Sequence, residues 1–231
     1  MKKYFIILIF QLLLSNNITK YEVSLYKIPM ANVTINYEKT IFKNKEAISL
    51  KFETQTNKFA STIFKVNNAY ETIIEPNNFN ILSFQKITDQ PGLHNELSTI
   101  NIKNHVIYEH TYPSIIIPKN YFNIFSLLYY LTVTPFEEIK ENINLEREGL
   151  LYSCIINKKE TETVYEYELI FKKKLKLPHR NQTPIIKDTD LFTWAIFKEN
   201  SNKKVIVHQK TNTIKSCIFS FGLTNLEAKI Q

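Results

Sequence analysis

The sequence predicts a mainly β protein: a single antiparallel curled sheet, half-barrel or barrel-like, with one central helix near residues 120–132. Short runs of alternating polar and apolar residues recur about every 8–12 residues, with polar turns between them. Hydrophobic residues make up 44% of the chain and aromatic residues 13%, which is enough for a sizeable core. Past the N-terminus, only residues 120–132 form a long segment with helical periodicity. The length of 231 residues suits one β-rich domain.

The helix prediction rests on an apolar stripe with stop signals around it. Ile124, Phe125, Leu128 and Leu131 fall on one face of a helix. Asn120 or Asn123 can serve as the N-cap, and Pro135 cannot continue a helix. A helix of this length, roughly 20 Å, is too short to cross a bilayer. We therefore expect it to face the core.

The alternating runs predict strands on both sides of the helix. Before it they cover residues 21–26, 32–37, 47–53, 61–66, 70–75, 81–88, 97–102 and 106–109. After it they cover residues 139–145, 150–156, 164–171, 191–197, 204–209, 214–219 and 223–230. The chain has only 3 glycines, so we expect asparagine to take over many of the tight turns, with Asn67-Asn68, Asn77-Asn78, Asn104 and Asn157 at plausible turn positions.

The N-terminus has the features of a secretory signal peptide. Lys2 and Lys3 precede an apolar run of about 11 residues, from Tyr4 to Leu14, which is too short to span a membrane. An uncleaved anchor is the alternative interpretation. We predict a signal peptide over residues 1–17 and one exported domain over 18–231, located in the periplasm or outside the cell. No later stretch is apolar enough to serve as a transmembrane span.

Charge and cysteine content add two expectations. The formal charge of +7 is mildly basic, and the densest lysine cluster, residues 172–176, is best explained as a solvated strand end. We expect no nucleic-acid partner. Cys154 and Cys217 both lie in strand-like runs. In an oxidising compartment they could form a disulfide, or they could be separate small residues in the core.

The residue patterns that support catalysis or metal binding do not occur. No serine has the context of a nucleophile, and the spacing of the histidines suits no zinc site. Glu146 and Glu148 are close in sequence, but we expect them on the solvent face of a strand. The sequence therefore predicts no catalytic residues, no metal and no cofactor, and a protein that is not an enzyme.

Several segments resemble a bacterial family of exported proteins, domain of unknown function 3108. Residues 21–35 are similar to the family's opening strand pair, and residues 64–76 are similar to a second segment of the family. Ser126-Leu127-Leu128-Tyr129 matches its Ser-x-x-Tyr helix core, and residues 192–197 match its strand with a tryptophan. The resemblance covers about residues 21–230. It implies an exported β-rich domain with no established activity.

Two functions fit these observations. In the first, the curled sheet carries a lipid or other apolar small molecule, with the helix covering it. Its ligand-binding residues would be Phe125, Leu128, Tyr129 and Trp194. In the second, the domain has a closed core, binds no ligand and acts in the structure or assembly of the envelope, with other envelope proteins as partners. Trp194 is the only tryptophan, and we expect it to anchor the core.

Overall fold

The structure is a computed structural model, and it describes residues 17–102, 105–108, 121–174, 176–177, 180–181 and 188–231. The predicted signal peptide, residues 1–17, lies outside this part except for its last residue. The strands before the first helix are β1 (Asn17–Leu25), β2 (Ile28–Phe42), β3 (Lys45–Thr56), β4 (Asn67–Ile74), β5 (Ile81–Gln90), β6 (Leu93–Ile102), β7 (His105–Tyr108) and β8 (Tyr121–Phe122). Those after it are β9 (Asn142–Arg147), β10 (Leu150–Glu160), β11 (Val164–Lys173), β12 (Lys176–Leu177), β13 (Arg180–Asn181), β14 (Asn202–His208), β15 (Thr213–Phe221) and β16 (Thr224–Ile230). The helices are α1 (Ile124–Val133) and α2 (Leu191–Phe197), with short 3-10 turns η1 (Ala60–Thr62) and η2 (Phe136–Glu138).

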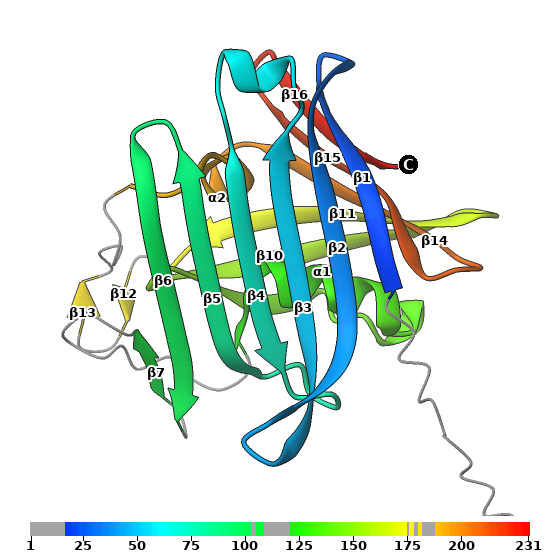
Figure 1. The fold of residues 1–231 in the computed structure, drawn as a ribbon. Coiled ribbons are helices and arrows are strands. Elements are labelled where there is room, and N and C mark those ends of the chain that lie inside the picture. Colours follow the sequence, from blue (N-terminus) through cyan, green and yellow to red (C-terminus); the bar gives the residue numbers. More distant parts are fainter. Residues whose placement is uncertain (1–16, 103–104, 109–120, 175, 178–179, 182–187) are drawn as a thin grey trace, which may run out of the picture.

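One curled sheet of 14 strands forms most of the molecule, which confirms the predicted fold class (Figure 1). Its order is β7-β6-β5-β4-β3-β2-β1-β16-β15-β14-β11-β10-β9-β8, and β12 and β13 form a separate pair. Neighbouring strands run antiparallel, except that β8 lies parallel to β9. The first strand β1 pairs with the last strand β16, so the ends of the described chain meet inside the sheet.

Within the described residues no backbone pairing joins the edge strands β7 and β8, and polar contacts run instead from β7 to β9 and the β9–β10 turn. The hydroxyl of Tyr108 on β7 donates a hydrogen bond to the carboxylate of Glu146 on β9. The Gly149 amide donates to the same Glu146 oxygen over 2.6 Å and to the Tyr108 hydroxyl over 3.0 Å. Leu97 and Tyr108 pack with Leu151 in a small apolar cluster. The sheet is therefore curled and unclosed, with polar contacts across the opening.

Several tight turns use positive φ angles without glycine. Tyr26 and Lys27 have φ values of 52° and 67° in the β1–β2 turn. Lys43 and Asn44 have 49° and 63° in the β2–β3 turn. This left-handed pair of residues matches the right-handed twist of a two-residue hairpin. The expectation that asparagine takes over these turns holds only in part. Asn44 and Asn77-Asn78 lie in turns, but Asn67-Asn68 and Asn157 lie within β4 and β10, and Asn104 is outside the described residues.

The helix α1 lies on the concave face of the sheet, as the sequence predicts. Asn123 is its N-cap: the Asn123 side chain accepts from the Ser126 amide over 2.8 Å, and the Ser126 hydroxyl accepts from the Asn123 amide over 3.0 Å. This reciprocal pair is a capping box. The predicted stripe of Ile124, Phe125, Leu128 and Leu131 is buried. Residues 121–122, which we assigned to the helix, instead form β8.

Two strand predictions were wrong. Residues 191–197 form the helix α2, because Asp190 caps them: its carboxylate accepts from the Thr193 amide over 2.8 Å. A short apolar run fits a strand and a buried helix equally well, so the sequence pattern alone did not decide. Residues 61–66 lie in the η1 turn and the loop after it, where the Asn57 side chain accepts from the Ala60 amide over 2.8 Å.

Of the two alternatives left open for the cysteines, the second holds: Cys154 and Cys217 are both free and buried. Cys154 lies on β10 and Cys217 on β15, and strands β11 and β14 separate them. Three strand spacings by themselves put their backbones at least about 14 Å apart, far beyond the reach of a disulfide. Both thiols are buried, and this burial raises the pKa of each to about 12.

Candidate functional site: an apolar cavity beneath the curled sheet

A cavity of about 320 Å³ lies on the concave side of the sheet, beneath β1, β2, β3, β15 and β16. Its strand wall consists of residues two apart in sequence, because alternate side chains of a strand point to the same face. On β1 and β2 these residues are Tyr21, Val23, Leu25, Ala31, Val33 and Ile35. On β3, β15 and β16 they include Phe52, Thr54, Thr56, Cys217, Phe219, Leu226 and Ala228.

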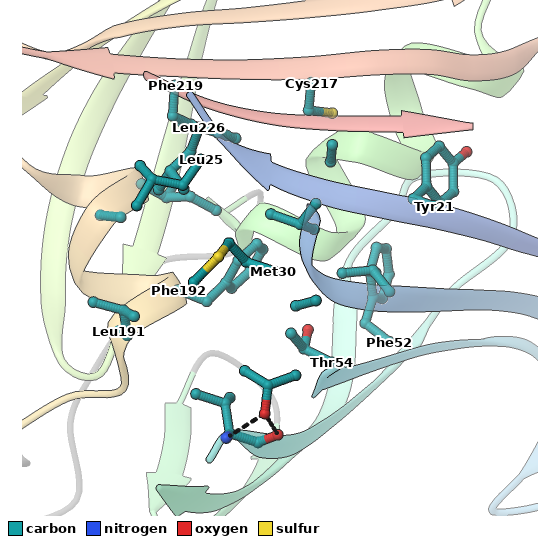
Figure 2. A pocket seen from close by; sticks show the side chains of 18 of the residues that line it. Tyr21, Leu25, Met30, Phe52, Thr54, Leu191, Phe192, Cys217, Phe219 and Leu226 are labelled. Carbon is teal, nitrogen blue, oxygen red and sulfur yellow. Dashed lines mark hydrogen bonds between the residues drawn. The ribbon is translucent and has the colours of Figure 1, made fainter. Parts of the chain in front are cut away.

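A β-bulge adds one more side chain to this wall. The pairing between β1 and β2 shifts after Val23, so Met30 has no partner residue on β1. Both Met30 and the next residue, Ala31, therefore line the cavity. Bulges of this kind redirect a side chain at the cost of regular pairing. The flexible Met30 side chain points into the space between β2 and α2 (Figure 2).

The helices close the opposite side of the cavity. Leu128 of α1 and Leu191, Phe192, Ala195 and Ile196 of α2 line it. Figure 2 shows Leu191 and Phe192 on this side. Phe64 and Ala60 from the β3–β4 loop complete the wall. Leu191 and Phe64 are exposed, at 45% and 37% of their surface, so the cavity opens to solvent beside them.

The chemistry of the cavity wall is almost wholly apolar. No lining residue is charged. The Tyr21 hydroxyl donates to the Ile214 carbonyl over 2.9 Å, and burial raises the pKa of this phenol, so it stays neutral. The Thr56 hydroxyl accepts from the Val66 amide over 3.0 Å. Few polar groups are therefore free to bind a polar ligand. An apolar guest gains from burial alone, as benzene does in an engineered apolar cavity of about 150 Å³.

Of the ligand-binding residues predicted from the sequence, only Leu128 lines this cavity. Phe125 instead packs into the core, with ring centroids 4.7 Å from Phe52 and 4.8 Å from Tyr70. Tyr129 packs edge-on against Tyr37 at 4.9 Å. The sequence identified the inward-facing helix stripe, but it did not show which part of the stripe meets a neighbour and which part faces empty space.

The prediction that Trp194 anchors the core was wrong. Its side chain is 41% exposed and lies outside the cavity wall. The indole packs edge-on against Phe221 at 5.5 Å, and the Lys198 ammonium lies 4.5 Å from the indole centroid. Because residues 191–197 form a helix, Phe192 and Trp194 point in different directions, whereas a strand would have placed them on one face.

A buried ionic cluster holds the start of α2 against the sheet. The Lys86 ammonium on β5 lies 2.7 Å from Asp190, the N-cap of α2, and also pairs with Glu148 in the β9–β10 turn. Burial by itself would raise the pKa of Asp190, but the positive charge of Lys86 and the hydrogen bonds from Lys86 and Thr193 outweigh it and lower the pKa. The Tyr70 hydroxyl also donates to Asp190 over 2.7 Å. Lys86, Glu148 and Asp190 are fully buried, so this cluster positions α2 and offers no surface to a substrate.

Little in the sequence indicated this cluster. We expected Glu146 and Glu148 on a solvent face, but Glu148 is buried and Glu146 is half-buried at the meeting of the sheet edges. Burial raises the pKa of Glu146 to about 7, although hydrogen bonds from Tyr108 and Gly149 favour its charged form. Lys86 stands in an alternating strand where a lysine normally marks the solvent side. The only indication in the sequence was that Lys86 occupies an inward-facing position in the alternating pattern of β5.

Among the described residues, no group of histidine, cysteine, aspartate or glutamate side chains has an arrangement that could hold a metal ion. The same part of the chain contains no helix with the length and apolar character needed to cross a bilayer.

Comparisons with known proteins support the fold but indicate no activity. A solved structure described as a β-barrel-like protein of domain of unknown function DUF1849 from Brucella abortus is similar, with a TM-score of 0.55 over 93% of this chain and 95% of that chain. Their sequences are only 6% identical, so the likeness concerns the fold alone. No protein-family model and no curated protein matches the chain. The resemblance to domain of unknown function 3108 thus stays a prediction.

Proposed function

We propose that this protein is an exported carrier of an apolar ligand, such as the acyl chain of a lipid, and has no catalytic role. The observation that supports the proposal is the open apolar cavity of about 320 Å³ beneath the sheet. This volume falls at the lower end of ligand pockets, which measure about 300–1,000 Å³. It suits one hydrocarbon chain better than a whole lipid.

The composition of the wall supports an apolar guest over a polar one. Binding sites for polar molecules place a few convergent hydrogen-bonding groups among apolar ones. Here no lining residue is charged, and the Tyr21 hydroxyl already donates to a backbone carbonyl. A charged headgroup buried in this wall would have no partner and would lose its hydration. The headgroup of a bound lipid would therefore remain outside.

Titration with a fluorescent fatty acid tests this proposal. Ala228→Phe places a ring in the cavity from β16, and we expect it to weaken binding by about tenfold or more. Ala69→Phe is the matched control, because Ala69 lies between the inward-facing Asn68 and Tyr70 and so points to the outer face of β4. Absence of binding to the wild-type protein, or equal binding by both variants, would contradict the carrier function.

The closed structural domain, the alternative from the sequence, would give a different result. It predicts no uptake of the fatty acid and no co-purified lipid in native mass spectrometry. Export is a separate part of the proposal and rests on the predicted signal peptide at residues 1–17. Fractionation of the source cells measures it, and the full-length chain in the cytosol would contradict it.

A further inference from the structure

Large apolar side chains are exposed around the mouth of the cavity. They come from the β1–β2 turn, the β3–β4 loop, the β15–β16 turn and α2. We call this set the rim: Tyr26, Ile28, Phe59, Ile63, Phe64, Leu191, Trp194 and Leu223. Leu223 is 93% exposed and Ile63 is 74% exposed. A contiguous apolar surface of this kind on a folded protein marks an interaction site.

The segments that carry the rim are joined to one another. The Tyr26 amide donates to the Asn225 carbonyl over 3.2 Å, which links the β1–β2 and β15–β16 turns. The Asn57 amide donates to the Met30 carbonyl over 2.9 Å, which links the β3–β4 loop to the start of β2. The Trp194 ring rests on Phe221 beside the β15–β16 turn. The three turns lie together at one end of the sheet, the upper end in Figure 1.

Each of these segments also supplies side chains to the cavity wall. Leu25 and Met30 flank the β1–β2 turn, and Phe219 and Leu226 flank the β15–β16 turn. Phe64 belongs to both the rim and the wall, and so does Leu191. The apolar surface of the rim therefore continues into the cavity without a polar boundary.

The charged residues within the rim segments are all lysines, although an exposed carboxylate, Glu199, directly follows Lys198. Lys27, Lys58, Lys65 and Lys198 are exposed in the rim segments. Residues 25–30, 57–66, 191–198 and 219–226 contain no aspartate or glutamate. Within the described residues, none of these lysines lies within ion-pair distance of a carboxylate. Lysines interleaved with exposed apolar side chains suit an anionic membrane surface, where the apolar groups enter the interface and the ammonium groups meet lipid phosphates.

We propose that the rim docks on the surface of a bilayer that contains anionic lipid, so that the cavity opens directly onto the acyl chains. This inference rests on the proposed carrier function and names its partner. A lipid chain would then pass from the bilayer into the cavity along a continuous apolar path, and its headgroup would remain near the lysines. The alternative, a protein partner on the same surface, would not require acidic lipid.

Trp194 reports on docking, because it is the only tryptophan and lies half-exposed in the rim. The experiment adds the mature protein to vesicles of phosphatidylcholine alone, or with about one third phosphatidylglycerol, at low and high salt. We expect the Trp194 emission to shift to shorter wavelength with the anionic vesicles only, and co-flotation with them that weakens as salt rises.

A matched pair of variants places the contact on the rim. Ile63 and Ile41 are both 74% exposed, but Ile41 lies at the far end of β2, at the opposite end of the sheet. Ile63→Asp should weaken vesicle binding at least about tenfold, and Ile41→Asp should leave it within about twofold. A second pair tests the role of positive charge. Lys65→Glu, in the rim, should weaken vesicle binding, and Lys43→Glu, near Ile41 at the opposite end, is its control. The unfolding midpoint confirms that each variant folds.

The outcomes separate this inference from the carrier function. A wild-type protein that takes up the fluorescent fatty acid but binds no vesicle would overturn the docking surface and leave the carrier intact. Vesicle binding without uptake of the fatty acid would support docking and contradict the carrier. Equal effects of Ile63→Asp and Ile41→Asp, or binding that ignores lipid charge, would overturn the proposal. The proposal would also be overturned if the protein self-associates through the rim, so that Ile63→Asp abolishes self-association but leaves vesicle binding intact.

Discussion

Two regions of the concave face have the same kind of lining but different contents. In the packed region, around α1, Phe125 contacts the rings of Phe52, Tyr70, Phe84 and Phe192. In the hollow region, beneath β1, β2, β15 and β16, equally apolar side chains face an open cavity. Both regions arise from alternating strands, so the difference comes from where the helices lie. Inward-facing apolar residues therefore form a packed core only where another element fills the concave side of the sheet.

The boundary between the two regions depends on α2. Its apolar residues Phe192, Ala195 and Ile196 line the hollow region, while its N-cap Asp190 is fixed by Lys86 on the packed side. A buried ion pair stabilises a fold weakly against an apolar replacement, but the loss of one partner leaves an unpaired charge. The cluster therefore matters most as the support that keeps α2 at the side of the cavity.

The largest expected effect comes from removing the buried cation. Lys86→Met leaves Glu148 and Asp190 buried together, and we expect it to lower the free energy of unfolding by about 3–5 kcal/mol in a denaturant titration. Lys204→Met is the control, since its pair with Glu166 at 3.1 Å is partly exposed to solvent and should contribute about 1 kcal/mol or less. Similar losses in both variants would show that the cluster does not support α2.

Truncation in the two regions should have unequal effects. Phe125→Ala removes a ring that is enclosed on all sides, so we expect a loss of about 3–5 kcal/mol. Leu226→Ala widens a space that already exists, so we expect about 1–2 kcal/mol, together with altered uptake of the fluorescent fatty acid. Denaturant and fatty-acid titrations of the same samples measure both quantities. Equal losses of stability would mean that the hollow region is filled in solution.

The sheet edges, where Tyr108 meets Glu146 beside the packed region, should make stability depend on pH. The pKa of Glu146 is about 7 in the folded protein against an ordinary value of 4.5. Between these values the folded state binds more protons than the unfolded state, so stability falls as pH rises. Glu146→Gln imitates the protonated form, and we expect it to add about 1–2 kcal/mol at pH 8 and much less at pH 4.

Unfolding midpoints across this pH range measure the effect. Glu141→Gln is the control, because Glu141 is exposed on the approach to β9. If the wild-type protein and Glu146→Gln lose stability in parallel as pH rises, the carboxyl is not protonated in the fold.

The smallest expected effect is a difference in reactivity between the two cysteines, which can be measured without any change in sequence. Cys217 lines the hollow region, whereas Cys154 is wholly enclosed in the packed region. A small apolar mercurial should therefore modify Cys217 well before Cys154 in the folded protein, and a bound fatty acid should slow that reaction. Peptide mapping by mass spectrometry measures the two rates. Equal rates in the native state would indicate that the cavity gives no access.

Local patterns in the sequence were enough for most of the secondary structure. Alternation along β1, β2, β10 and β11 depends on a period of two residues, which the chain itself determines. For α1, the apolar stripe, the Asn123 cap and Pro135 all lie within a few turns of one another, so they could be recognised without any long-range contact. The curled antiparallel sheet followed from the spacing of such runs.

The tertiary structure alone decided the helix at residues 191–197, the separation of the two cysteines and the hollow under the sheet. Asp190 can remain as a buried cap only because Lys86, 104 residues earlier, brings a neutralising charge to it. Cys154 and Cys217 are apart because the order of strands in the sheet inserts β11 and β14 between them. Whether an inward-facing side chain meets a partner or an empty space depends on elements far away in the chain. An alternating pattern reports the face on which a residue lies and carries no information about what lies opposite.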